Sequence, residues 1–207
     1  IILDELISFH NVDIEWGNHD IEWMGASLGN EALILNALRI AVRYNCYDML
    51  EDGYGISLRA LNDFAARTYM DDTCELFMPK ILDENKYDVV RPSLSAKIQK
   101  ALAIMQFKVE GKLIKKHPEY DMQDRILLER INFDDFTIDL CGKKYKLLDN
   151  YFPTIDKQNP LKLSNEEEIL LKSLKTSFIH SSKLKSHIKF LYDKGSLYKI
   201  HNGNLLY

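Results

Sequence analysis

The 207-residue chain has only three cysteines, Cys46, Cys74 and Cys141, and they lie far apart. An odd number of widely spaced cysteines indicates neither a disulfide framework nor a zinc-binding pair. Free thiols are typical of a reducing compartment, so we expect a cytoplasmic protein. No apolar run reaches the ~18 residues that a bilayer span needs. The start of the sequence has no signal-peptide pattern, and we expect no membrane partner.

The sequence also lacks a strong excess of charge of one sign. It carries 27 basic and 31 acidic side chains, for a net charge of −4. The two signs are mixed along the chain, without the basic run that nucleic-acid-binding tails use. We therefore expect no nucleic-acid partner. The apolar fraction, 46%, is that of a globular protein with a buried core.

Apolar residues recur every three or four positions in several segments, a spacing that predicts a mainly α-helical chain with a few strands. Because the strands are separated by long helical stretches, the fold class is α+β. The pattern predicts these helices: 1–9, 30–44, 57–70, 93–117, 126–131, 167–178 and 183–194. Helix 30–44 is apolar over most of its circumference, which predicts burial on more than one side. Residues 71–91 are expected to form a connection with little regular structure.

Local signals predict where several helices begin. Polar residues that cap helix N-termini precede four of the expected helices. They are Asn30, Ser57, Ser164 with Glu167 as a capping box, and Ser181 or Ser182. Pro92 opens the longest helix, at a position where its missing N–H is harmless.

Three segments alternate between apolar and polar residues, as strands do. The first is DIEW, 13–16, which Gly17 ends. The second, 136–148, turns at Gly142 and predicts a β-hairpin. The third, 197–207, contains Asn202-Gly203, the signal for a two-residue hairpin turn.

Gly17-Asn18-His19-Asp20, directly after the first expected strand, combines side chains that handle metals and protons. An Asn carbonyl oxygen is a ligand for a hard divalent metal. His ligates a metal, donates a proton or stabilises charge on a phosphoryl group. Asp20 would accept a hydrogen bond from the imidazole or from nearby amides. The alternative is a polar turn in which Asn18 or Asp20 caps the following helix.

Other candidate residues are more isolated. Arg39 and Arg43 lie four residues apart on one helix face, where two guanidinium groups suit a sugar phosphate. The alternative is that they extend into solvent or pair with Glu51 and Asp52. Three large apolar side chains flank the motif and are expected to pack in the core or to form the wall of a pocket: Trp16, Trp23 and Met24. The other histidines are isolated and are expected on surfaces or helix faces: His10, His117, His180, His187 and His201.

The motif Gly17-Asn18-His19-Asp20 resembles a signature block of the calcineurin-like metallophosphoesterases. Flanking segments narrow the resemblance to class III fructose-1,6-bisphosphatase, the manganese-dependent bacterial type. In chain order they are VDIEWGNHDIEWMGASLGN, LRIAVRY, LEDGYGISLRAL, FMPK, DNYFPTID with KLSNEEE, and KGSLYKIHNGNLLY. The resemblance implies that Asn18 binds a metal, that His19 serves the leaving group and that Asp20 supports them. It also implies Mn²⁺ as cofactor and a sugar bisphosphate as substrate.

This chain lacks parts of the family's pattern. The Asp-x-His and Gly-Asp-x-x-Asp blocks that precede the motif in that family are absent, as are the metal-binding histidines beyond the segment that resembles NGNLLY. We therefore expect the interior of a longer enzyme, inactive by itself. The expected divisions are a piece of the α/β metallophosphoesterase core, 1–26, a mostly helical insertion, 27–193, and a returning β-hairpin of the core, 194–207.

The sequence alone leaves two other functions open. A different enzyme of the same superfamily would keep Asn18 and His19 but act on a phosphoprotein or a nucleotide. Alternatively, residues 27–193 would form a helical module for self-association or effector binding. The apolar helix 30–44 favours a homo-oligomer in that case.

Overall fold

The computed structural model describes residues 2–9, 11–80 and 91–206, and within them the chain is mostly helical with a few short strands. The fold class expected for the chain is therefore confirmed. The α-helices are α1 (Ile2–Ser8), α2 (Asn18–Ser27), α3 (Glu31–Arg43), α4 (Arg59–Thr68), α5 (Pro92–Lys116), α6 (Asn165–His180) and α7 (Ser182–Lys194). In this described part, no helix has both the length and the apolar content to cross a bilayer.

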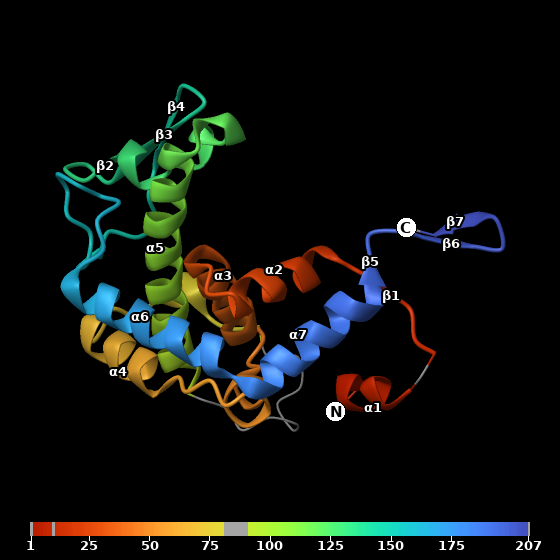
Figure 1. Cartoon of the computed structure of the whole chain (residues 1–207). Coiled ribbons are helices and arrows are strands. Elements are labelled where there is room, and N and C mark those ends of the chain that lie inside the picture. Colours follow the sequence, from red (N-terminus) through yellow and green to blue (C-terminus); the bar gives the residue numbers. More distant parts are fainter. Residues whose placement is uncertain (1, 10, 81–90, 207) are drawn as a thin grey trace.

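The core lies where α3 packs against α5, with α2, α4 and α6 around them (Figure 1). Helix α3 is buried on two sides because it packs between α2 and α5, as its apolar circumference predicts. Its fully buried side chains include Ile34, Leu35 and Leu38. These residues suggested an oligomer contact in the sequence, but the chain covers them with its own helices.

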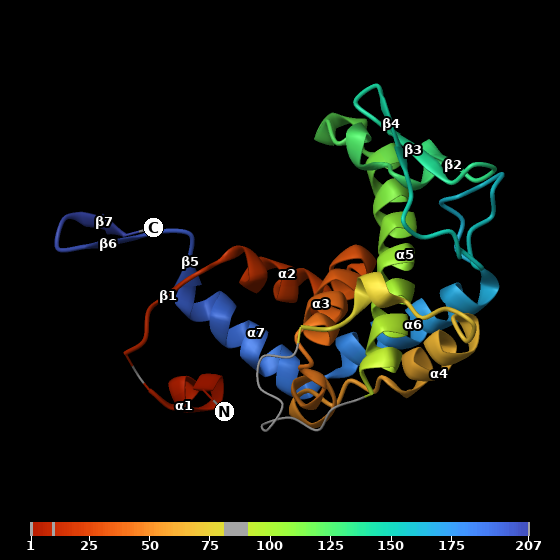
Figure 2. The same ribbon diagram turned by 180° about the vertical axis from the view of Figure 1, so that it is seen from behind.

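The two ends of the helical body meet in a parallel strand pair. Strand β1 (Ile14–Glu15) pairs with β5 (Gly195–Ser196), with Ile14 opposite Gly195. Figures 1 and 2 show this pair at the far end of α7, away from α5. Consequently residues between β1 and β5 form one long excursion between two neighbouring parallel strands.

Gly195 permits this pairing because the Trp16 side chain crosses directly over it. A Cβ at position 195 would overlap the indole nitrogen of Trp16. That nitrogen donates a hydrogen bond to the carbonyl of Leu191, at 2.8 Å, and the Trp16 amide donates to the Ser196 carbonyl, at 3.0 Å. Trp16 therefore joins β1 to the end of α7.

Two further sheets lie outside the helical core. Strands β2 (Ile131–Asn132), β3 (Thr137–Leu140) and β4 (Lys143–Lys146) form an antiparallel sheet at one end of α5. Strands β6 (Lys199–His201) and β7 (Asn204–Leu206) form a hairpin that stands away from the helices in both views (Figures 1 and 2). Both turn residues, Asn202 and Gly203, have positive φ, as a type I′ turn requires. Both hairpin predictions are confirmed.

The helix predicted at 126–131 is wrong. The region forms the 3₁₀ turns η4 (Gln123–Arg125) and η5 (Leu128–Arg130), and then β2 begins. The buried residues are Ile126 and Leu128, two positions apart, which pack with Ile114 and Leu161. Such spacing cannot put both side chains on one face of an α-helix.

Capping predictions are confirmed at three helices and wrong at one. The Asn30 side chain accepts from the Leu33 amide, and Ser181 accepts from Leu184. Ser164 and Glu167 form the reciprocal capping box. At α4, by contrast, the N-cap is Leu58.

The carboxylate of Glu51 accepts the Leu58 amide, at 3.0 Å. Glu51 lies in η1 (Met49–Gly53), a π-helical turn that the sequence pattern did not predict. Within the predicted connection 71–91, the described residues contain one 3₁₀ turn, η2 (Glu75–Phe77), and 81–90 lie outside the described residues.

Candidate functional site

The Gly17-Asn18-His19-Asp20 motif lies where β1 ends and α2 begins. Gly17 is the N-cap of α2, with extended backbone, and Asn18 is the first helical residue. Because the Trp16 amide bonds to Ser196, the motif sits at the carboxyl end of β1, beside β5. Asn18 and His19 are both exposed on the first turn. This position, at the carboxyl end of a parallel strand, is where α/β proteins commonly place chemistry.

Asp20 holds the turn that presents the motif. Its Oδ2 accepts a hydrogen bond from the Gly17 amide, at 2.8 Å. The carboxylate also places negative charge in the first turn, where the helix dipole favours it. Gly17 occupies the N-cap position, and the Asp20 carboxylate caps this helix end by accepting from the Gly17 amide. The alternative of a polar turn in which one of Asn18 and Asp20 caps the helix is thus borne out for Asp20.

His19 is oriented by a carboxylate one turn further along α2. Its Nδ1 lies 3.1 Å from Oε2 of Glu22. With the proton on Nδ1, the ring donates to Glu22 and Nε2 is available as an acceptor; a protonated ring offers a donor at Nε2. The side chain of His19 is 64% exposed. An imidazole held in this way suits proton transfer to or from a group that approaches from solvent.

A cavity of about 220 Å³ lies beside His19, between α2 and α3. Glu22 and Trp23 line it from α2, and Ile40 and Tyr44 line it from α3. Apart from the pair formed by His19 and Glu22, the walls are mostly apolar and aromatic. The cavity is therefore mainly apolar, with one polar pair, His19 and Glu22, in its lining.

The two arginines predicted to act together are in different environments. Arg39 lines a larger cleft, of about 710 Å³, and its Nη2 donates to Oδ1 of Asn36, at 3.3 Å. Arg43 is exposed and lines neither this cleft nor the cavity beside His19. The predicted partner Glu51 is instead bonded to the Leu58 amide. The structure therefore does not bring Arg43 into one site with Arg39.

The large apolar residues around the motif mainly build the core. Trp16 stacks on Tyr192, with ring centroids 6.2 Å apart. Trp23 packs against Tyr54 and Phe178 and also lines the cavity beside His19. Core packing is thus confirmed for Trp23, which is in addition a pocket wall, whereas Trp16 packs at the end of α7 outside the core clusters.

A metal centre is not assembled by the residues that the structure describes. None of the groups of His, Cys, Asp and Glu in this part of the chain has three members placed to hold one ion. The described residues therefore do not fit a complete dinuclear centre.

Sequence reasoning missed two buried lysines on α5. Lys108 is fully buried and bonds Oε2 of Glu167, at 2.8 Å, and the Thr154 carbonyl, at 2.6 Å. Burial lowers the pKa of Lys108, and the hydrogen bond to Glu167 opposes that shift. Glu167 is also the capping-box residue of α6. This pair fixes α6 on α5.

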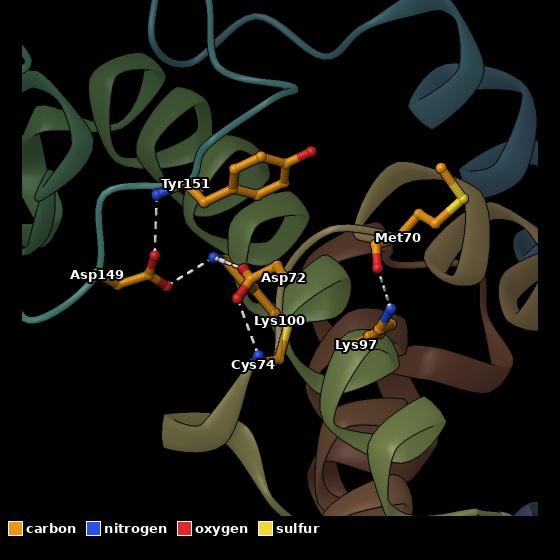
Figure 3. Close-up of polar contacts among 7 residues, drawn as sticks. All are labelled: Met70, Asp72, Cys74, Lys97, Lys100, Asp149 and Tyr151. Carbon is orange, nitrogen blue, oxygen red and sulfur yellow. Dashed lines mark hydrogen bonds and ion pairs between the residues drawn. The ribbon is translucent and has the colours of Figure 1, made fainter.

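Lys100 occupies a similar position two turns earlier in α5. Its Nζ lies between the carboxylates of Asp72 and Asp149 (Figure 3). Burial raises the pKa of the neighbouring Cys74 thiol to about 12, and the charge of Asp72 adds to this rise. Three aromatic rings surround the ammonium: Tyr69, Tyr151 and Phe152. Because the charge is compensated and enclosed, we assign Lys100 a structural role.

His187 is the one described histidine that is buried. Its Nε2 lies 2.7 Å from Oδ1 of Asp4, and its Nδ1 lies 3.3 Å from the Tyr54 hydroxyl. The contact to Asp4 fastens α1 to α7. Of the two positions expected for it, surface or helix face, the structure shows the second, because His187 lies on the same buried face of α7 as Leu184 and Leu191. His10 lies outside the described residues.

Comparison with known proteins gives consistent results along the whole chain. A family described as Firmicute fructose-1,6-bisphosphatase matches residues 1–207. Proteins named "Fructose-1,6-bisphosphatase class 3" are similar over the entire chain: 50% identical in Clostridium novyi, 51% in Clostridium acetobutylicum and 50% in Clostridium tetani. The chain spans 31% of the length of each of these relatives. No solved structure matches it.

The family match covers the helical excursion from end to end, including the two parallel strands that bound it and the Asn and His at the end of the first strand. The chain belongs to the Firmicute fructose-1,6-bisphosphatase family. The resemblance to class III enzymes is thereby confirmed.

Proposed function

We propose that this chain supplies the Asn–His corner of a metal-dependent phosphatase that hydrolyses fructose 1,6-bisphosphate to fructose 6-phosphate and phosphate. The observation that carries the proposal is the placement of Asn18 and His19, exposed on the first turn of α2 at the carboxyl end of β1. The names of relatives about 50% identical over the whole chain support the substrate. We also assign the enzyme to the cytoplasm, where a sugar bisphosphate is available.

In this reaction the oxygen of a water molecule forms a bond to phosphorus, and the phosphorus–oxygen bond to the sugar breaks. The departing sugar oxygen takes up a proton, which His19 supplies in its protonated form. Glu22 fixes the orientation of the ring through its contact with Nδ1. Asp20 keeps the turn at Gly17 in place, and so positions Asn18 and His19 together.

Asn18 would contribute one oxygen ligand to a metal, for which we propose Mn²⁺. Carboxylates and carbonyl oxygens suit this hard cation, and imidazole nitrogens also bind it. Two bound ions would bring the charge that stabilises phosphoryl transfer. Because the described residues hold no complete ligand set, the others come from the rest of the whole protein.

The strand pairing supports the proposed division of the chain. Residues 1–26 and 194–207 belong to the phosphatase core, because β1 and β5 are adjacent parallel strands. Residues 27–193 form the helical insertion with its own core. The exposed apolar side chains of the β6–β7 segment, such as Ile200 and Leu205, then pack on the remainder of the core.

Replacing Asn18 and His19 in the whole protein tests the proposal. We expect His19→Ala to lower kcat for fructose 1,6-bisphosphate at least ~100-fold, because it removes the general acid. We expect Asn18→Ala to lower kcat at least ~100-fold, because it removes a metal ligand. Asn165→Ala is a matched control, because Asn165 is also the exposed first residue of a helix. His180→Ala, on an exposed histidine of α6, controls for His19. Full activity in either site variant would contradict the assignment.

A further inference from the structure

A cleft of about 710 Å³ brings together residues from five parts of the chain, one of them the end of β3 with Leu140 and Cys141. Glu22 lines it from α2, Arg39 from α3, Gln106 and Glu110 from α5, and the segment of η4 and η5 closes it. Figure 1 shows α5 running from its contact with α3 to the end that carries the β2–β4 sheet. Glu22 also lines the cavity next to His19, so this one side chain is shared by the cleft and the cavity.

Three arginines line the cleft: Arg39, Arg125 and Arg130. They come from segments far apart in the sequence. Arg130 donates to the Gln123 carbonyl, at 3.1 Å, which leaves most of its donors available. Among the described residues, no partner is found for the guanidinium of Arg125, which is exposed.

Two buried polar atoms in this cleft lack hydrogen-bond partners: Nε of Arg39 and Oε1 of Gln106. The rest of their side chains is held in place, because Arg39 bonds Asn36 and Gln106 bonds Glu110, at 2.6 Å. Buried polar atoms are rarely left unpaired in folded proteins, so a fixed donor and a fixed acceptor here indicate a ligand that uses both.

We infer that this cleft binds the phosphate of the sugar that is not cleaved, with Arg39 and Arg125 as its principal donors. The inference rests on the proposed function, since it places the second phosphate of the same substrate. Guanidinium groups match phosphate oxygens in geometry and charge. The carboxylates of Glu22, Glu110 and Asp124 balance the arginines in the same cleft. This mixed lining suits a sugar phosphate better than a bare anion, because carboxylates accept hydrogen bonds from sugar hydroxyls.

The test measures binding and specificity in the whole protein, with Arg125→Ala and Arg39→Lys. Arg125→Ala alters an exposed side chain and is expected to leave the fold intact. Calorimetric titration with fructose 6-phosphate is expected to show a Kd at least ~10-fold higher in each variant. The matched control is Arg59→Ala, an exposed arginine of α4 that lies outside the cleft.

Kinetics separate this inference from the proposed function. The ratio of kcat/KM for fructose 1,6-bisphosphate to that for p-nitrophenyl phosphate, which has no second phosphate, should fall at least ~10-fold in Arg125→Ala. An unchanged ratio with unchanged affinity for fructose 6-phosphate overturns the cleft assignment, even if the wild-type enzyme is a fructose-1,6-bisphosphatase. A wild-type protein that hydrolyses only p-nitrophenyl phosphate refutes the proposed function, and the fructose 6-phosphate titration still decides the cleft.

Discussion

Glu22 and His19 lie on successive turns of α2, with Oε2 of the carboxylate 3.1 Å from Nδ1 of the imidazole. The same carboxylate lines both the cavity beside His19 and the arginine-lined cleft. Glu22 thus lies between the residue proposed to protonate the leaving group and the cleft proposed to hold the other phosphate. The sequence motif by itself gave no indication of this residue.

Replacing Glu22 by Gln in the whole protein should impair turnover without unfolding it. The amide keeps the size of the side chain but replaces the carboxylate that orients Nδ1 of His19 by a weaker hydrogen-bond partner. We expect kcat to fall about 10- to 100-fold, the usual effect of losing an outer partner of a functional histidine. Steady-state phosphate release measures this. Glu168→Gln, an exposed change on α6, should have no such effect, and equal rates for Glu22→Gln and wild type would exclude the role of Glu22.

Gly195→Ala should destabilise the chain because the new methyl group would overlap the indole of Trp16. The Trp16 side chain must move, which weakens its bond to Leu191 and the β1–β5 pairing. Overpacking of this kind costs about 1–3 kcal/mol. Urea unfolding of the chain provides the measurement. Gly53→Ala is the control, since a Cβ there makes only an ordinary contact with the Asp48 carbonyl.

Separating the buried pair Lys108 and Glu167 should destabilise the chain strongly. Lys108→Met leaves a carboxylate buried without its cation, for which the expected loss is about 3–5 kcal/mol. Lys115→Met breaks the partly exposed pair with Glu129 and should cost less than about 1 kcal/mol. Denaturant unfolding compares the two variants. If their losses were equal, the Lys108 pair would not hold α6 on α5.

Ionised Asp72 should stabilise the fold, and this contribution should be lost when the carboxylate is protonated at acid pH. Burial tends to raise its pKa, but the hydrogen bonds from Lys100 and the Cys74 amide outweigh burial, and the net pKa is lowered. The contribution is therefore present above the unfolded-state value of about 3.9 and is lost as pH falls through the folded-state pKa. Asp72→Asn should flatten the acid side of the stability profile, measured by unfolding at a series of pH values. Asp71→Asn, on the exposed neighbour, should retain the wild-type slope.

Local features of the fold were predictable because short segments determine them. The capping box of Ser164 and Glu167 and the Asn202-Gly203 turn need only adjacent residues, and both are confirmed. The segment around Ile126 was mispredicted because its two buried residues pack on α5 and Leu161, which the local pattern does not contain.

Buried charges and the cleft depend on contacts between distant segments. Lys100 and Lys108 look like solvated residues until Asp149 and Glu167 are placed against them. A signal was present, because both lysines lie on one face of α5 with the buried Ile104. The placement of Arg39 and Arg125 on one cleft had no comparable signal, since it arises only when the 3₁₀ turns fold back on α5.

The most direct test of the account compares this 207-residue chain with the whole protein in Mn²⁺ titration calorimetry and phosphate release from fructose 1,6-bisphosphate. We predict tight Mn²⁺ binding and turnover by the whole protein, loss of both in its Asn18→Ala variant, and neither in the 207-residue chain. Micromolar Mn²⁺ binding with turnover by the 207-residue chain would contradict the claim that the metal ligands are shared with the rest of the protein.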